Sequence, residues 1–284
     1  MAASWLANPH ETRIVLDRYG LATKHRLGQN FLVNDSVIGQ ILELAELEPN
    51  DFVLEIGPGI GTLTVALLPQ VARIVAVEAD KSLAPVLAQT CKKNASHLQL
   101  IWGDALQIVP GQLRVIAPGI TKCVSNLPYQ IAATLILKIL SEVPEIERLV
   151  VMVQSEVADR IAADPGTKAY GAYTAKLALW GTVTGRFEVS PSCFLPPPHV
   201  KSAVIRIDRI SQDELSCAQK KKTAAVISAA FAQRRKTLRN SMSHSGYEAR
   251  LLDEAFETCG ISGGVRAETL DPKEFVQLAE ALGW

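Results

Sequence analysis

A glycine-rich turn and two acidic residues are the first features whose types and spacing suggest chemistry. The turn spans residues 55–61 (Glu-Ile-Gly-Pro-Gly-Ile-Gly) and directly follows a short apolar run. Its glycines, Gly57 and Gly59 among them, allow a tight turn and let a ligand approach the main chain. Glu78 and Asp104 end the next two apolar runs. There, the first carboxylate can accept hydrogen bonds from ribose hydroxyls and the second from an adenine amino group.

This set favours a nucleoside ligand that lacks a pyrophosphate. In open α/β sheets, ligands bind at the carboxyl ends of the strands, so we expect the turn and both acids to converge. A dinucleotide-binding turn would carry its third glycine at the position that Thr62 holds. S-adenosylmethionine, which has a ribose and an adenine, therefore fits better than NAD. A nicotinamide dehydrogenase is the weaker alternative.

The tetrapeptide Asn-Leu-Pro-Tyr at residues 126–129 follows the fourth apolar run and suggests a reaction. The lone pair of an aromatic amine is delocalised into its ring, so the amine is a poor nucleophile. The Asn126 side chain, with the backbone carbonyl of Leu127 or Pro128, could accept the amine hydrogens and favour the pyramidal geometry needed to attack a sulfonium methyl. Tyr129 would stack on the base. We expect direct methyl transfer without a covalent intermediate or a strong general base.

Basic residues form two separate clusters in a chain whose formal net charge is zero, with 29 Lys and Arg against 29 Asp and Glu. This balance excludes a uniformly basic nucleic-acid binder but allows a basic patch. The first cluster precedes the glycine-rich turn and comprises Arg13, Arg18, Lys24 and Arg26. Between residues 215 and 250, eight basic residues face one acidic residue, Glu248. Four of them are predicted to share a turn and a half of helix and to neutralise RNA phosphates: Arg234, Arg235, Lys236 and Arg239.

Other classes of protein are disfavoured by what the chain lacks. The five histidines are dispersed and the five cysteines contain no CxxC pair, which predicts neither a metal site nor a disulfide framework. The cysteine usage favours a reducing cytoplasm. No apolar run approaches the roughly 18–20 residues of a membrane-spanning helix, and no secretory signal is visible. We therefore expect a cytoplasmic protein that uses neither a metal nor a membrane.

Alternating strand and helix patterns must position the candidate residues. Short β-branched runs alternate with helical stretches over the first two-thirds of the chain, which predicts a doubly wound α/β domain with a parallel sheet. A later pair of strands is expected to close one sheet edge, joined by a stiff proline-rich loop at 191–198. The expected strands are 52–56, 73–78, 98–102, 122–125, 149–153, 187–189 and 203–207, and the expected helices between them are 62–68, 82–93 and 131–140.

Only helical patterns follow residue 208. Helices are expected over 221–240 and 247–259, and a last one begins at Asp271, where Pro272 and Glu274 complete a capping box with a first-turn proline. We therefore predict two domains: residues 1–208, which bind S-adenosylmethionine and catalyse methyl transfer, and residues 209–284, a small all-helical domain that binds RNA.

Taken together, these motifs resemble those of the ribosomal RNA adenine dimethyltransferases over about residues 19–282. The resemblance implies a Rossmann-like class I S-adenosylmethionine-dependent methyltransferase sheet with a helical C-terminal domain. Residues 28–32 (Gly-Gln-Asn-Phe-Leu) are similar to the family's N-terminal cofactor motif, which implies that Asn30 and Leu32 touch the cofactor. The family's methionine, ribose, adenine and active-site positions fall on Gly57, Glu78, Asp104 and Asn126.

Three further segments resemble family motifs. The Phe-Pro-rich loop at 194–202 implies that Phe194 sandwiches the target base against Tyr129, and residues 231–240 look like the family's RNA-contacting helix. Residues 154–160 resemble the motif after the fifth strand, except that Ser155 stands where Lys is usual.

The nearest branch of the family implies a specific substrate. Its members dimethylate N6 of two adjacent adenosines near the 3′ end of 16S rRNA, so the expected partner is that RNA within the 30S subunit, and the expected role includes ribosome biogenesis by a monomer. A 23S rRNA adenine methyltransferase of the resistance type is an alternative, although the Phe194 loop and the basic segment favour the small-subunit enzyme. A ribosome-assembly factor that acts mainly by binding is a second alternative.

Overall fold

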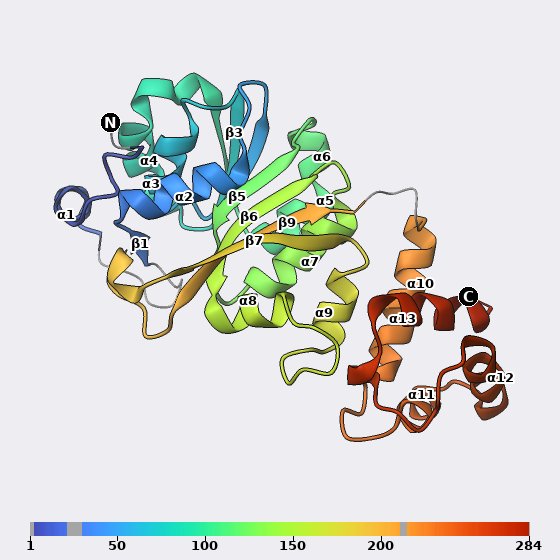
Figure 1. Cartoon of the computed structure of the whole chain (residues 1–284). Helices are drawn as coiled ribbons and strands as arrows, with labels where there is room; N and C mark the ends of the chain where they lie inside the picture. The colour runs from blue at the N-terminus through green and yellow to red at the C-terminus, as the bar shows by residue number, and fades with distance from the viewer. Residues whose placement is uncertain (1–2, 22–29, 211–214, 284) are drawn as a thin grey trace. The chain divides into compact units, whose positions relative to one another are not determined.

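The structure is a computed structural model that describes residues 3–21, 30–210 and 215–283 (Figure 1). The chain divides into two compact units. The first comprises residues 1–158 and 183–208, and the second comprises residues 159–182 and 209–284. No helix within these described ranges has both the length and the apolarity needed to cross a bilayer.

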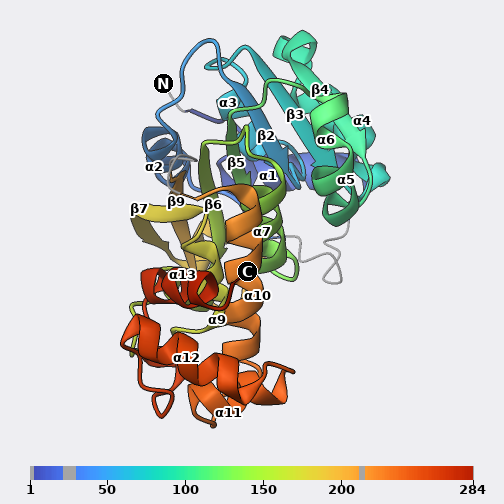
Figure 2. The same cartoon turned by 90° about the vertical axis from the view of Figure 1, so that its right-hand side faces the viewer.

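A seven-stranded, mostly parallel sheet forms the framework of the first unit. Its inner strands are continuous apolar runs because helices cover both faces of the sheet. Figures 1 and 2 show α2 on one face and α5 and α7 on the other. The strand order is β4 (Leu98–Trp102), β3 (Arg73–Glu78), β2 (Phe52–Ile56), β5 (Lys122–Asn126), β6 (Arg148–Gln154), β9 (Ser202–Arg209) and β7 (Gly181–Val189), with β9 antiparallel to β6.

The sheet confirms the predicted α/β class and all seven predicted strands. Strands β2, β3 and β4 have the predicted bounds, and β7 is longer than predicted because it begins at Gly181 rather than near residue 187. A separate two-stranded ribbon pairs β1 (Phe31–Leu32) with β8 (Phe194–Leu195). Strand β8 lies within the predicted proline-rich loop, directly after the short 3₁₀ turn Pro191–Cys193, and its last residue begins a cis Leu195–Pro196 peptide.

The helices of the first unit connect successive strands. One expected helix, 82–93, is shorter than predicted, because Asp80 caps a 3₁₀ turn at Lys81–Leu83 and an α-helix follows only to Thr90. The helices are α1 (Pro9–Arg18), α2 (Asp35–Ala45), α3 (Thr62–Leu67), α4 (Ala84–Thr90), α5 (Ala105–Gly111), α6 (Leu113–Ile116), α7 (Ala132–Glu142) and α8 (Ser155–Ile161), with a 3₁₀ segment at Lys92–His97.

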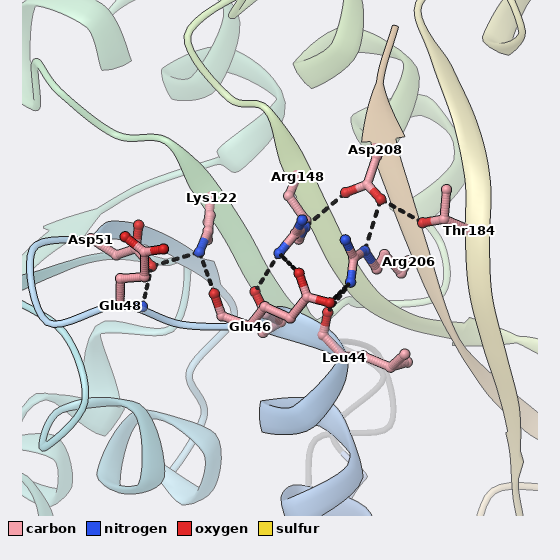
Figure 3. A network of polar contacts seen from close by, with 10 residues as sticks. Leu44, Glu46, Glu48, Asp51, Lys122, Arg148, Thr184, Arg206 and Asp208 are labelled. Carbon is pink, nitrogen blue, oxygen red and sulfur yellow. Dashed lines mark hydrogen bonds and ion pairs between the residues drawn. The ribbon is translucent and has the colours of Figure 1, made fainter.

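A network of charged side chains joins the strands at their amino-terminal edge (Figure 3). Asp208 accepts hydrogen bonds from Arg148 Nε at 2.7 Å and from Arg206 Nε at 2.8 Å. Glu46, at the end of α2, forms ion pairs with the same two arginines at 2.8 and 2.6 Å. Burial opposes ionisation of Asp208, but the hydrogen bonds from Thr184 and the arginines outweigh it and lower its pKa. The network thus fixes α2 to β6 and β9.

The second unit consists of helices around an aromatic core. Phe231 contacts Tyr170 at a ring-centroid distance of 6.2 Å and Phe275 at 5.9 Å. The capping box predicted at Asp271 is confirmed, with Glu274 N donating to its side chain at 2.8 Å. The helices are α9 (Ala172–Leu177), α10 (Cys217–Ala230), α11 (Leu238–His244), α12 (Ala249–Cys259) and α13 (Pro272–Ala281), with a 3₁₀ turn at Ala267–Thr269.

The boundary between the units differs in one respect from the predicted division at residue 208. Residues 159–182 belong to the helical unit, although they precede the last two strands in sequence. Tyr170 explains this placement, because its ring is 2% exposed and its hydroxyl donates to the carbonyl of Leu270 at 2.8 Å. The helical unit is therefore discontinuous in sequence.

The single helix predicted over 221–240 is wrong. Helix α10 ends at Ala230 and α11 begins at Leu238, with Thr237 as its N-cap. The Thr237 side chain accepts a hydrogen bond from Asn240 N, which starts a new helix rather than continuing the old one. The amide of Gln233 donates to Ser241 Oγ at 3.0 Å and fixes the turn between them.

Candidate active site

A cavity of about 240 Å³ lies at the carboxyl ends of β2, β3, β4 and β5 in the first unit. The ends of neighbouring parallel strands and the β1 ribbon supply its walls, as expected for a ligand site in an open α/β sheet. Eight residues singled out from the sequence line this one cavity: Asn30, Leu32, Gly57, Gly59, Glu78, Asp104, Asn126 and Tyr129.

The glycine turn and the Asn126–Tyr129 loop are in contact. Gly57 has a φ of +69°, which only glycine adopts without strain. A Cβ atom at Gly57 would lie 3.4 Å from Cγ of Pro128, so the two loops meet at van der Waals distance. A Cβ at Gly59 would lie 3.2 Å from the Phe31 ring, so the turn also has the β1 ribbon against it. The predicted convergence of these segments is thus observed.

The Glu78 carboxylate is held at the end of β3 by backbone amides. Its Oε1 accepts from Asp80 N at 2.8 Å and its Oε2 from Gly59 N at 3.3 Å. Burial raises its pKa, and the amides of Asp80, Gly59 and Ala79 oppose that rise. These contacts aim the carboxylate toward the glycine turn. Asp104 caps α5 through a 2.9 Å bond from Leu106 N and is exposed at the cavity wall.

Glu55 is a third carboxylate of the cavity, to which the sequence assigned no role. Its side chain is 1% exposed, and burial raises its pKa to about 8, with a smaller contribution from the charge of Glu78. Glu55 Oε2 and the hydroxyls of Thr62 and Thr64 are buried and have no hydrogen-bond partner among the described residues. The Thr64 hydroxyl is near enough to lower the Glu55 pKa somewhat, although it lies outside hydrogen-bonding geometry. Glu55 and Thr62, which line the cavity, therefore present buried oxygens suited to a ligand with cationic or N–H groups.

The backbone of the Asn126–Tyr129 loop distinguishes between its two candidate carbonyl acceptors. The Pro128 carbonyl already accepts from Ile131 N and Ala132 N, both at 3.1 Å, where α7 begins. Leu127 N donates to Met152 O at 3.1 Å, which fixes the loop to β6. Because the Pro128 oxygen is engaged by the helix start, the Leu127 carbonyl is the better acceptor for a substrate amine.

Tyr129 lines the cavity, but Phe194 does not join it there. The Tyr129 hydroxyl lies 2.6 Å from Ser202 Oγ, and burial raises the Tyr129 pKa. Phe194 is 2% exposed, pairs with Leu32 in the β1–β8 ribbon and packs in the core of the first unit. The structure therefore does not show the predicted sandwich of Phe194 and Tyr129. The apolar ring gains more from core packing than from a place at the cavity wall.

The four predicted RNA-binding residues do not share a helix. Arg234, Arg235 and Lys236 are exposed in the turn between α10 and α11, and Arg234 Nη2 donates to the Lys168 carbonyl at 3.3 Å. Arg239 lies on α11 and makes a bidentate ion pair with Asp253 of α12, at 2.6 and 2.8 Å. The turn thus presents three cations to solvent, whereas Arg239 is engaged within the protein.

Sequence reasoning missed three residues around the cavity. Phe31 lies inside the predicted cofactor motif but carries no chemical signal of its own, because it is apolar. Glu55 was visible only as the first residue of the glycine motif, and its burial could be suspected from its place at the end of an apolar strand. Ser202 has no recognisable signal in the sequence, and only its contact with Tyr129 in the structure identifies it. Among the described residues, no group of three His, Cys, Asp or Glu side chains is placed to hold a metal ion.

Comparisons with known proteins agree over nearly the whole chain. The family model "Ribosomal RNA adenine dimethylase" matches residues 20–283. A protein of Clostridium acetobutylicum named ribosomal RNA small subunit methyltransferase A is 39% identical, covering 95% of this chain and 98% of that protein. One of the same name from Magnetococcus marinus is 41% identical, covering 94% of each chain.

Two solved structures resemble the fold of this chain. A dimethyladenosine transferase from Plasmodium falciparum has a TM-score of 0.73 at 26% identity, covering 87% of this chain and 95% of that one. The 23S rRNA methyltransferase ErmE has a TM-score of 0.70 at 26% identity, covering 90% of this chain and 100% of that one.

Proposed function

The chain belongs to the ribosomal RNA adenine dimethylase family, and from that membership we propose that it methylates the RNA of the small ribosomal subunit. As a family member it is a ribosomal RNA adenine dimethyltransferase. The proposed targets are N6 of two adjacent adenosines near the 3′ end of 16S rRNA, and the proposed methyl donor is S-adenosylmethionine. The proposed substrate form is the 30S particle, and the enzyme is proposed to act as a monomer in the cytoplasm.

One observation carries this proposal: Gly57 of the glycine turn and Pro128 of the Asn126–Tyr129 loop line the same cavity side by side, so close that a Cβ atom at Gly57 would be in van der Waals contact with the proline ring. A donor bound along the turn would therefore have its reactive end beside the amide of Asn126. The residues of the cavity fit such a donor, since Glu78 is aimed toward the glycine turn for ribose hydroxyls and Asp104 stands exposed at the wall for the adenine amine. The buried acceptors around Glu55 suit the protonated amine of a methionine moiety.

The chain's own residues prepare the target amine. When bound, S-adenosylmethionine supplies an electrophilic methyl group on a sulfonium. Asn126 Oδ1 and the Leu127 carbonyl accept the two amine hydrogens of adenine, which directs the nitrogen lone pair out of the ring plane. Tyr129 stacks on the base and sets its orientation. The methylated amine then loses a proton to water, so no side chain has to act as a strong base.

The exposed cations of the turn after α10 support RNA binding. Arg234, Arg235 and Lys236 would contact phosphates, which gives affinity without sequence specificity. Arg239 is removed from this role, since its guanidinium is bound to Asp253 through two hydrogen bonds. Specificity for the two adenosines would then depend on the folded shape of the ribosomal particle.

An Asn126→Ala variant tests the proposed chemistry. We expect single-turnover methylation of undermethylated 30S particles to slow by about 100-fold or more, because a fixed acceptor for the developing charge is lost. Cofactor affinity, measured by calorimetry, should change much less. Asn50→Ala, a change at an exposed asparagine, is the matched control. A variant at Asn126 that retained normal turnover would contradict the mechanism.

A 23S rRNA substrate is the second candidate, favoured by the similarity to ErmE at 26% identity. The higher identities of 39% and 41% to the small-subunit methyltransferases favour 16S rRNA instead. Primer extension on 16S and 23S rRNA after reaction would distinguish them. If the protein acted mainly as an assembly factor, cells carrying only the Asn126→Ala variant would assemble ribosomes normally despite the missing methyl groups.

A further inference from the structure

A hydroxyl of strand β9 contacts the proposed base-stacking residue. Tyr129 Oη lies 2.6 Å from Ser202 Oγ, although the two residues are 73 positions apart in the chain. Ser202 is completely buried at the start of β9, whereas Tyr129 is partly buried and lines the cavity. Strand β9, which supplies none of the cavity-lining residues, thus contacts the cavity wall through Tyr129.

Ser202 is itself rigidly placed. In the sheet it lies opposite Gln154 of β6, and the carbonyl of its neighbour Lys201 accepts a hydrogen bond from Ser155 N at 2.9 Å. Both contacts attach the start of β9 to the junction of β6 and α8. A buried side chain on a strand start that is attached to its neighbour in this way is a fixed reference point for the phenol.

Tyr129 needs such a reference point. A phenol ring rotates about two side-chain bonds, and its stacking surface moves with them. The bond at Oη fixes the far end of the ring, while the loop backbone fixes the near end through Leu127 N and the Pro128 carbonyl. Because both ends of the ring are held, its plane is fixed before a base binds. Less conformational freedom of the Tyr129 side chain then has to be lost when the base binds and reacts.

We propose that Ser202 is a positioning residue for methyl transfer: its hydroxyl holds the Tyr129 ring in the plane on which the target adenine stacks. This inference rests on the proposed function, since it takes Tyr129 as the residue that stacks on the base. Ser202 does not touch the reacting atoms and acts only through Tyr129.

A double-mutant cycle tests this role. Ser202→Ala and Tyr129→Phe remove the same hydrogen bond from opposite sides, so each should lower kcat on 30S particles by roughly 3- to 10-fold, the usual range for one such bond. The double variant should be no slower than either single variant. Cofactor affinity should stay within about twofold. Multiplying effects in the double variant would overturn the proposal, because Ser202 would then act on something other than Tyr129.

A spectroscopic readout separates positioning from general support of the fold. The Ser202 contact opposes the rise in the Tyr129 pKa that burial causes, so Ser202→Ala should raise that pKa further. Ultraviolet difference titration against Tyr129→Phe would isolate this phenol. Thr12→Val is the matched control, because it removes another fully buried hydroxyl, bonded to the Leu6 carbonyl at 2.8 Å, and should leave both kcat and the titration unchanged.

Tyr129→Ala distinguishes the failure of this inference from the failure of the proposed function. If Tyr129→Ala retains full turnover, the stacking role itself is wrong. If Tyr129→Ala is inactive while Ser202→Ala turns over as the parent does, the stacking role stands and the role of Ser202 is overturned. Should Ser202→Ala fail to fold, Tyr129→Phe still removes the hydrogen bond and leaves Ser202 in place.

Discussion

Replacing Glu55 with Gln should change how the stability of the protein depends on pH. The carboxyl is 1% exposed, and burial raises its pKa from 4.5 to about 8. Between these two values the folded protein binds a proton that the unfolded chain does not, so the free energy of unfolding falls as pH rises through that window. The loss is complete above the folded pKa. At alkaline pH the ionised Glu55 carboxylate thus lowers the free energy of unfolding of the ligand-free protein.

The size of the effect follows from the pKa difference of about 3.5 pH units. At about 1.4 kcal/mol per unit, ionisation of Glu55 would lower the free energy of unfolding by roughly 5 kcal/mol over the whole titration, of which roughly 4 kcal/mol falls between pH 5 and pH 8.5. Glutamine has nearly the same shape and does not ionise. The Glu55→Gln variant should therefore match the parent near pH 5 and become progressively more stable than the parent toward pH 8.5.

Urea unfolding of the ligand-free protein at several pH values would measure this difference. Glu78 also has a raised pKa but is present in both proteins, so its contribution cancels to first order. Cys91 and Cys123, the other titratable groups near Glu55, have pKa values raised by burial to about 11 and about 12 and remain protonated throughout this window. Parallel stability curves for the parent and Glu55→Gln would show that Glu55 ionises normally and would refute the reasoning.

Three further variants test the cavity of the first unit and the basic turn of the second unit. Glu78→Ala should weaken S-adenosylmethionine binding by roughly 10- to 100-fold in calorimetry, because hydrogen bonds to a charged group are lost. Neutralising Arg234, Arg235 and Lys236 together should weaken RNA binding and reduce its logarithmic salt dependence by about 2, at roughly 0.7–0.9 for each phosphate that is no longer neutralised. Arg239→Ala should leave that salt dependence unchanged, because its partner is Asp253 and not a phosphate.

Each of these tests has a control on the same chain. Asp17→Ala removes an exposed carboxylate that does not line the cavity and should not affect cofactor binding. Neutralising the exposed Lys92 and Lys93 removes positive charge outside the α10–α11 turn and should change the salt dependence little. If neutralising Lys92 and Lys93 reduced the salt dependence as much as neutralising the α10–α11 turn does, RNA binding would depend on the total charge of the protein rather than on the turn. If Arg239→Ala reduced the salt dependence of RNA binding, Arg239 would have to be counted among the residues that contact RNA.

The sequence predicted most of the sheet and the cavity because their signals are local. The strands are continuous apolar runs, and the chemistry-bearing residues directly follow them, as Glu78 and Asn126 do. In a parallel sheet, residues at successive strand ends are brought together by the topology alone. The capping box at Asp271 was equally local, since all its partners lie within four residues.

What the sequence missed depends on pairings between distant segments. Phe194 reads as part of a proline-rich loop, and only its pairing with Leu32 buries it. Residues 159–182 precede the last strands, but the burial of Tyr170 assigns them to the helical unit. The break before α11 has a local signal in the sequence, because Thr237 is a good N-cap. The apolar residues on either side of it follow helical spacing, and this pattern predicted one continuous helix instead. The rest of the helical interpretation remained sound.

The charged network of Figure 3 has a consequence for how this protein can adapt to temperature and salinity. Arg148 is the first residue of β6 and Lys122 is the first residue of β5, so the network lies at the end of the strands away from the cavity. Ionic networks respond to salt and heat differently from apolar packing. Substitutions in the network can therefore change the melting temperature at one end of the sheet while the residues that line the cavity at the other end stay the same.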